Sequence, residues 1–285
     1  MYSLLHKNPN PSNYMIIFST RLILLFISIL FLSCISINSL YSQKSIRDST
    51  INLVMIDISY GGYLPQGDLG KRFGYTSLLG GNVGFKFKSN LYLSLGGYFL
   101  FGDNIKENQI LKGVSHYNMF TDGRSTAVDA GWIDRDGQVI VPSLAQRGFT
   151  IPFRVGKIFN KISFKKTNPN TGLFIETGAQ FMQHHISISA PVNVPYITGD
   201  YEKGYDRLTQ GIGVLGSVGY RYFGSSRFIN FFFAFDYQYN FTQNRRFDFD
   251  LQRQDTRTRS DILTGFRFGW TIPLYKEAPE GYYYY

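Results

Sequence analysis

Residues 228–242, FINFFFAFDYQYNFT, alternate between large ring-bearing or branched side chains and smaller or polar ones. Every second residue from Ile229 to Phe241 belongs to the first class, and the residues between them include Asp236 and Asn240. Successive side chains of a β-strand point to opposite faces, so this period of two predicts an extended strand with one strongly apolar face. A fold built from such strands has to bury that face or place it against lipid.

Seven further segments show the same alternation, whereas the 3.6-residue period of an amphipathic helix does not occur after residue 45. Together with 228–242, they predict eight strands. The low content of charged residues, 17%, and the 29 glycines agree with many closely packed strands. The further segments are 52–60, 75–87, 91–101, 149–159, 173–181, 212–222 and 262–274.

Three features favour lipid over water on the apolar face. The segments reach about 10 residues or more, the length that a tilted strand needs to cross a bilayer. The other face is rich in Gly, Ser and Asn and carries few charges, unlike a water-facing surface. Tyrosines gather near strand ends, where amphipathic rings sit at the headgroup level. We therefore predict an all-β fold, an antiparallel up-and-down transmembrane β-barrel of about eight strands, with a periplasmic or surface β-sandwich as the alternative.

The first part of the chain has the order of a secretory signal. Arg21 precedes an apolar run at 22–37, and small and polar residues follow, with a cleavage point after Ser42. An uncleaved membrane anchor is the alternative, because the run is just short of a spanning helix. Cys34, the one cysteine, lies in this run, and its neighbours loosely resemble a lipoprotein cleavage box. The predicted segments are a signal peptide with a cleaved helix at 1–42, a lead-in at 43–50, the barrel at 51–275 and an aromatic tail at 276–285, in a protein of the cell outer membrane.

Connections of two lengths alternate along the chain. Short turns at 88–90 and 224–227 are expected to face the periplasm, together with the longer segment 160–170. The other connections are expected at the cell surface, and they span 63–74, 102–148, 187–207 and 243–257.

Side chains just fill the interior of an eight-stranded barrel, so an open aqueous pore is not expected. A charge in so narrow a space is costly unless it is paired. The inward positions of the predicted strands carry four bases and three acids, which we expect to form salt bridges across the lumen. An ion path or proton relay through the same residues is the alternative. The seven residues are Asp57, Lys86, Arg154, Glu176, Arg221, Asp236 and Arg267.

The search for reactive groups yields one constellation, and we predict no catalytic residue, metal or cofactor. The sequence HHISIS places His185 and Ser187 on one face of a strand, as a base and a hydroxyl nucleophile would be. Some outer-membrane lipid A deacylases resemble this arrangement, with a His-x-Ser pair and a nearby Glu, for which Glu202 is the acid at a comparable distance. The flanking residues do not match, and a histidine pair at the membrane rim is the plain structural interpretation.

The net charge of +9 does not lead us to predict nucleic-acid binding, because Lys7 and Arg21 leave with the signal and other bases lie in the lumen. The segment 244–261 mixes arginines with aspartates. A loop at the outer surface of the outer membrane lies beside phosphorylated lipopolysaccharide, and the guanidinium group of arginine binds phosphate well. We expect outer-membrane lipid and lipopolysaccharide as partners of this loop, with simple solvated loop ends as the alternative. The arginines are Arg245, Arg246, Arg253, Arg257 and Arg259.

An export leader ending in YSQ, eight alternating strands, the final strand DILTGFRFGWTIPLY and an aromatic tail resemble the small outer-membrane barrels of Bacteroidetes, of the broad OmpA/OmpX-like type. The resemblance covers residues 51–275. It implies a non-enzymatic anchor, binding or accessory component of the envelope with a protein partner there, and some such barrels serve secretion or gliding machineries. A lipid A-modifying hydrolase and a small-solute pore are the alternatives. The chain departs from the pattern in one respect: the aromatic that recruits the assembly machine is expected to end the last strand, whereas KEAPEGYYYY follows Tyr275. Either Tyr275 serves as that signal from within the chain, or the tyrosine tail is a periplasmic contact segment.

Overall fold

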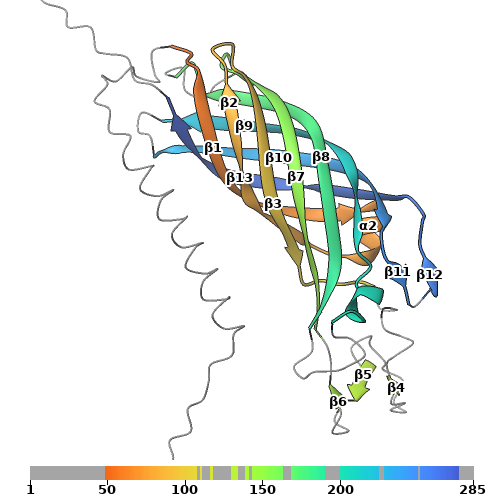
Figure 1. The fold of residues 1–285 in the computed structure, drawn as a ribbon. Coiled ribbons are helices and arrows are strands. Elements are labelled where there is room, and N and C mark those ends of the chain that lie inside the picture. The colour runs from red at the N-terminus through yellow and green to blue at the C-terminus, as the bar shows by residue number, and fades with distance from the viewer. Residues whose placement is uncertain are drawn as a thin grey trace, which may run out of the picture. The chain divides into compact units, whose positions relative to one another are not determined.

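The computed structural model describes residues 49–107, 110, 143–162, 168–189, 199–224, 228–249 and 251–275, together with 116–117, 130–133 and 139–140. The predicted signal peptide, the aromatic tail and most of the lead-in lie outside these residues. Eight strands close into a barrel, in the order β1-β13-β10-β9-β8-β7-β3-β2 (Figure 1). Each long strand lies beside the next one in the chain, and the last pairs with the first. This confirms the predicted all-β fold with eight antiparallel strands.

The barrel strands are longer than typical strands of soluble proteins. They are β1 (Leu53–Gln66), β2 (Thr76–Lys86), β3 (Leu91–Gly102), β7 (Ser143–Phe159), β8 (Gly172–Ser189), β9 (Thr209–Phe223), β10 (Asn230–Asn244) and β13 (Arg259–Leu274). Short elements occupy the connections: α2 (Gly67–Arg72), β4 (His116–Tyr117), β5 (Ala130–Ile133), β6 (Val139–Ile140), the 3-10 helix η1 (Glu202–Gly204), β11 (Phe247–Asp248) and β12 (Arg253–Gln254).

The two ends of the barrel differ. The turn 87–90 and the facing ends of β9 and β10 lie at the end where β1 begins and β13 ends, which we call the turn end (Figure 1). The other end, the loop end, carries α2, η1 and the β11–β12 hairpin. This arrangement of short and long connections agrees with the alternation predicted from the sequence.

Several strands run further toward the loop end than the sequence predicts. β1 continues to Gln66, β7 begins at Ser143 and β8 continues to Ser189, although these residues fall in or beside predicted loops. The predicted loop 63–74 also contains the helix α2. These boundaries were wrong for two reasons. β7 and β8 continue past the last apolar residue of their outer face, and β1 continues through GGYLPQ, whose glycines and proline resemble a turn.

The apolar face of β8 changes sides along its length. Ile175 near the turn end is exposed, whereas Ile186 and Ile188 near the loop end are buried, and His185 and Ser187 lie on the outer face there. An outward apolar row suits hydrocarbon, and an inward apolar row with polar residues outside suits water. The loop-end part of the strand is therefore built as in a soluble barrel.

The middle of the barrel carries a belt of exposed apolar side chains. Val83 is 60% exposed and Leu95 58%, and the aromatic rows of β10 and β13 share this face, with the Phe233 and Phe266 rings stacked at 5.4 Å. Tyr60 and Tyr75 are exposed toward the loop end. Exposed apolar side chains in such continuous rows are unfavourable in water, which indicates contact with lipid. Among the described residues, no helix has the length and apolar content to cross a membrane.

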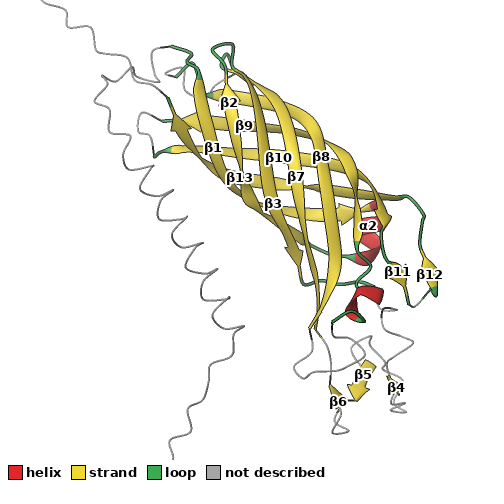
Figure 2. Ribbon diagram, in the orientation of Figure 1, coloured by secondary structure: helices red, strands yellow, loops and turns green. Residues whose placement is uncertain are grey.

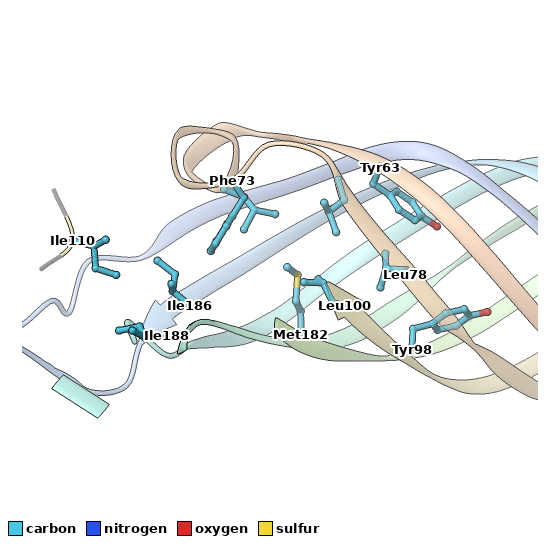
Figure 3. Close-up of a cluster of buried hydrophobic side chains, with 11 residues drawn as sticks. Tyr63, Phe73, Leu78, Tyr98, Leu100, Ile110, Met182, Ile186 and Ile188 are labelled. Carbon is cyan, nitrogen blue, oxygen red and sulfur yellow. The ribbon is translucent and has the colours of Figure 1, made fainter. Parts of the chain in front are cut away.

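The interior is filled in layers, with an apolar cluster toward each end. The turn-end cluster consists of Ile51, Leu53, Met55, Tyr92, Ile158, Phe174, Phe223, Phe232 and Ala234. The loop-end cluster consists of Tyr63, Leu69, Phe73, Leu78, Tyr98, Leu100, Ile110, Met182, Ile186, Ile188 and Leu263 (Figure 3).

The helix α2 turns back from β1 and lies at the loop-end mouth of the barrel (Figure 2). Leu69 and Phe73 belong to the loop-end cluster and are fully buried. The carboxylate of Asp68 accepts a hydrogen bond from the backbone N–H of Ser260 at 3.1 Å, which ties α2 to the start of β13. The helix therefore packs into this mouth of the barrel.

One interruption marks the barrel wall, between β3 and β7. The register runs up to Leu95↔Phe153 and resumes at Tyr98↔Thr150, so that Gly96 and Gly97 lack partners in this ladder. Pro152 faces this gap and has no N–H to donate, which explains the missing pair. On its other side, Pro152 keeps its pairing with Gln180 of β8.

The exposed belt leads to a first prediction. Phe266 is exposed on β13, and Phe266→Arg places a charge in the apolar belt, which we expect to lower the free energy of unfolding by about 2–4 kcal/mol in lipid vesicles. Denaturant unfolding in vesicles measures the change. Ser189→Arg, at an exposed position where β8 ends at the loop end, is the control and should change stability little. Equal, small effects of the two substitutions would contradict a lipid-facing belt.

Candidate functional site

The seven charged residues predicted for the lumen all lie in the interior and are almost completely buried. Six of them form ion pairs, and the seventh, Lys86, does not pair with an acid among the described residues. The paired residues come from β1, β7, β8, β9, β10 and β13, so the ion pairs cross the lumen rather than run along one strand. They lie between the two apolar clusters, because one tyrosine of each cluster donates a hydrogen bond to a carboxylate of this group.

The first group of charges joins β1, β9 and β13. Arg221 donates to both carboxylate oxygens of Asp57, at 2.8 and 3.0 Å, and to the hydroxyl of Thr271 at 2.7 Å. Thr271 donates in turn to Asp57 at 2.6 Å. Bidentate pairing joins the two terminal nitrogens of the guanidinium to both carboxylate oxygens, which helps to offset their desolvation, whereas Nε of Arg221 has no hydrogen-bond partner among the described residues.

The second group is centred on Arg267. Its guanidinium donates to Glu176 at 2.5 Å and to Asp236 at 2.8 Å, and Glu176 also pairs with Arg154 at 3.3 Å. Glu176 accepts a hydrogen bond from the hydroxyl of Tyr92, and Asp236 accepts one from Tyr63, each at 2.7 Å. These tyrosines belong to the turn-end and loop-end clusters, so the network connects the two apolar layers.

Aromatic rings cover the remaining faces of the guanidinium groups. The carbon Cζ of Arg221 lies 4.6 Å from the ring centroid of Phe232, and that of Arg267 lies 5.0 Å from the same ring. Arg154 lies over Tyr98 at 5.7 Å. A cation over a ring face is stabilised further where water is excluded. The network is thus packed as well as paired.

Lys86 lies apart from the network, toward the turn end. Its ammonium donates to the side-chain oxygen of Asn170 at 2.7 Å and to the backbone oxygen of Ile51 at 3.4 Å. Asn170 also donates to the backbone oxygen of Ser49 at 3.0 Å. These contacts hold the start of the described chain across the turn end of the barrel.

A second polar group at the loop end was not predicted from the sequence. Arg72 of α2 donates to Glu107 at 3.1 Å and to Thr209 at 3.1 Å, and Glu107 also pairs with Arg207. Arg207 pairs in turn with Asp248 at 3.3 Å. Burial lowers the pKa of Arg72 to about 9, with further lowering by the nearby positive charge of Arg259. These residues lie in connections without a repeating pattern, so no signal in the sequence indicates their pairing.

The histidine pair HHISIS splits between the two faces of β8. His184 is buried and its Nε2 lies 3.0 Å from Asp261, which also accepts a 2.5 Å hydrogen bond from Thr242. His184 also packs edge-on against Phe73, with ring centroids 5.5 Å apart. His185 and Ser187 lie on the outer face, two residues apart on an extended strand, or roughly 7 Å between Cα atoms. Within the described residues no hydrogen bond joins them, and Glu202 accepts one from the backbone N–H of Ile188 at 3.4 Å.

The five loop arginines fall into two groups. Arg259 is buried at the start of β13 and pairs with Asp255 at 2.7 Å, and Arg246 pairs with Asp206. Arg245, Arg253 and Arg257 are exposed. Arg259 therefore cannot face a lipid headgroup, because β13 begins at this residue, earlier than the predicted strand, and turns its side chain inward.

Asp206 occupies the connection between η1 and β9. Its side chain accepts a hydrogen bond from the backbone N–H of Leu208 at 3.2 Å and pairs with Arg246. Burial raises the pKa of Asp206 to about 6, although the Arg246 guanidinium opposes the change. Among the described residues, no group of three or more His, Cys, Asp or Glu side chains is arranged to hold a metal ion.

Comparison with known proteins gives similarities of fold only. No family model and no curated protein match the chain. The N-terminal β-barrel domain of OprF from Pseudomonas aeruginosa is similar, with 12% identity and a TM-score of 0.35 over 78% of this chain and 98% of that chain. Ail, the attachment invasion locus protein of Yersinia pestis, in complex with the heparin analogue sucrose octasulfate, has 8% identity and a TM-score of 0.38 over 78% and 99%. A major outer membrane protein from Thermus thermophilus has 11% identity and a TM-score of 0.39 over 78% and 99%. Scores this low say nothing of the chain's function.

The buried pairs lead to a second prediction. Arg221→Met leaves the carboxylate of Asp57 buried without its charged partner, and we expect the free energy of unfolding to fall by about 3–5 kcal/mol. Combining it with Asp57→Leu removes both charges and should restore much of that loss. Denaturant unfolding in lipid vesicles compares the single and double variants. A double variant that is less stable than either single variant would contradict this account of the pair.

Asp206 leads to a third prediction. The carboxyl carbon resonance of Asp206, followed by NMR in detergent micelles, should titrate with a midpoint near pH 6, compared with roughly 4 for a free aspartate. Arg246→Gln removes the positive charge that favours the carboxylate, so the midpoint should rise further. A midpoint that stays the same in this variant would show that the two side chains do not interact, and one that falls would contradict the predicted direction.

Proposed function

We propose that the chain is an integral outer-membrane β-barrel with a filled lumen, which acts as a non-enzymatic anchor or binding component of the envelope through its surface loops. The observation that carries the proposal is the combination of an exposed apolar belt on the outside with paired, buried charges inside. A closed barrel is one of the two structures that satisfy every backbone group in hydrocarbon.

The interior supports a sealed barrel over a small-solute pore. Aromatic and apolar side chains fill both ends of the lumen, and three arginines and three carboxylates cross-link its middle. The helix α2, with its Arg72 contacts, packs into the mouth at the loop end. A path for ions would have to break several of these buried pairs, each of which is costly to open.

The outer face of β8 gives the hydrolase alternative no support. A serine nucleophile needs a base within hydrogen-bond reach, and none of the described contacts joins His185 to Ser187. The other histidine, His184, is buried, pairs with Asp261 and packs against Phe73. Function through the loops, by binding a lipid or an envelope protein, is what the geometry supports best.

Planar-bilayer recording tests the sealed lumen. We expect the detergent-purified barrel to insert without stable single-channel steps, because the lumen is packed along its length. A porin purified in the same detergent serves as the positive control for insertion and recording. Reproducible steps from the wild-type barrel would overturn the filled-lumen proposal and favour the pore.

Cell fractionation tests whether the protein is in the membrane or is a soluble protein. After cell fractionation, the chain should stay with the outer-membrane pellet under high salt and enter solution with detergent. Recovery from the soluble fraction without detergent would refute the membrane assignment.

A further inference from the structure

We propose that two loops at the loop end together form a binding surface for the phosphate groups of an amphiphilic lipid in the outer leaflet. We call this surface the loop platform, and it consists of the described residues of 199–208 and 245–258. The inference rests on the proposed function, because it requires the barrel to sit in a membrane with the loop end at the outer leaflet.

The two loops of the platform are held against each other by backbone hydrogen bonds, a ring contact and an ion pair. The backbone N–H of Arg245 donates to the oxygen of Leu208 at 2.9 Å, and that of Phe249 donates to Gly204 at 3.0 Å. The rings of Tyr205 and Phe249 pack edge-on at 5.2 Å. The ion pair of Arg246 with Asp206 adds a link from side chain to side chain. A binding surface held in this way loses little conformational freedom when a ligand binds.

Internal pairing leaves the platform with an excess of exposed positive charge. Its buried or half-buried aspartates are already paired with arginines: Asp206 with Arg246, Asp248 with Arg207 and Asp255 with Arg259. Lys203 and Asp200 neutralise each other at 2.5 Å.

Three exposed bases remain, Arg245, Arg253 and Arg257, none of which forms an ion pair with an acid among the described residues. Glu202 is the one acid of the described platform without an ion pair, and its carboxylate already accepts the Ile188 N–H. Asp255 and Asp68 offset part of the charge of Arg257, which leaves Arg245 and Arg253 as the less opposed pair. Guanidinium groups bind phosphate with two parallel hydrogen bonds, which makes a phosphorylated ligand the best match for this surplus.

Exposed apolar side chains lie among these arginines and favour a lipid over a soluble anion. Tyr201 is 63% exposed, Phe247 50% and Leu251 48%. In the hairpin, Asp248 of β11 is buried while its neighbour Phe247 is exposed and lies opposite Gln254 of β12, two residues from Arg245 in the chain. The hairpin lies at the loop end of the barrel (Figure 1). Apolar residues beside bases are the pattern of a surface that meets lipid headgroups and the acyl chains below them.

A binding experiment with the full chain in detergent micelles tests the inference. The probes are lipid A with its phosphates, the same lipid after phosphatase treatment, and inorganic phosphate. We expect phosphorylated lipid A to bind at least about tenfold more tightly than the dephosphorylated form, and higher salt to reduce the difference. Inorganic phosphate should compete only weakly, because it cannot use Tyr201, Phe247 and Leu251.

Two triple variants locate the site. Arg245→Gln, Arg253→Gln and Arg257→Gln together should abolish the preference for the phosphorylated lipid. The matched control replaces three exposed lysines at the turn end, Lys88→Gln, Lys157→Gln and Lys161→Gln, and should keep the preference. Both variants change surface residues outside the buried network, so circular dichroism should show an intact barrel in each.

Each other outcome overturns the inference in a distinct way. Equal binding of both lipid forms, or equal loss in both triple variants, would show that charge at the platform does not recognise phosphate. Inorganic phosphate that competes as well as lipid A would indicate a site for soluble anions instead. All of these results leave the membrane barrel intact, whereas a chain that is soluble without detergent refutes the proposed function itself.

Discussion

Closure of the hydrogen-bonded ladder between β1 and β13 is the constraint on which the rest of the structure depends. Hydrocarbon offers no partner to a backbone N–H or C=O, so an open sheet edge cannot persist there. The register from Val54↔Leu274 to Gln66↔Ile262 joins the first strand to the last over their whole shared length. Closing eight strands also fixes a narrow interior. The dense packing of that interior, and the need to pair each charge within it, follow from this one seam.

Pairing inside the barrel has a second effect, on how the strands are aligned. A one-residue slip of any strand would move its inward charges into the lipid and its apolar residues into the lumen. Asp57, Glu176 and Asp236 meet arginines from strands on other sides of the lumen, so slips in several strands would each leave a buried charge alone. The attraction within the buried pairs is largely offset by the cost of removing the charges from water, so the network adds little to stability. Its main effect is to favour one alignment of the strands over the others.

The sequence predicts the number of strands and the inward charges, because the alternation of apolar and polar residues is visible within each segment and does not depend on contacts with other segments. The partners of those charges depend on contacts between distant segments, such as Arg267 with Glu176, 91 residues apart. The helix α2 and the pairing of Arg72 with Glu107 depend on packing at the mouth of the barrel and have no local pattern. Arg259 shows the same limit: its burial depends on where β13 begins, and the polar residues around it resemble a loop.

Along β8 the wall of the barrel is built for hydrocarbon near the turn end and for water near the loop end. The part near the turn end is stabilised by the bilayer, which accepts its outer rings. The part near the loop end has buried residues of its own, including Phe73 and Ile186, and depends on water to favour their burial. Part of the cohesion of this protein therefore does not come from the bilayer, although the hydrogen bond from Tyr63 to Asp236 still ties the loop-end layer to the stem.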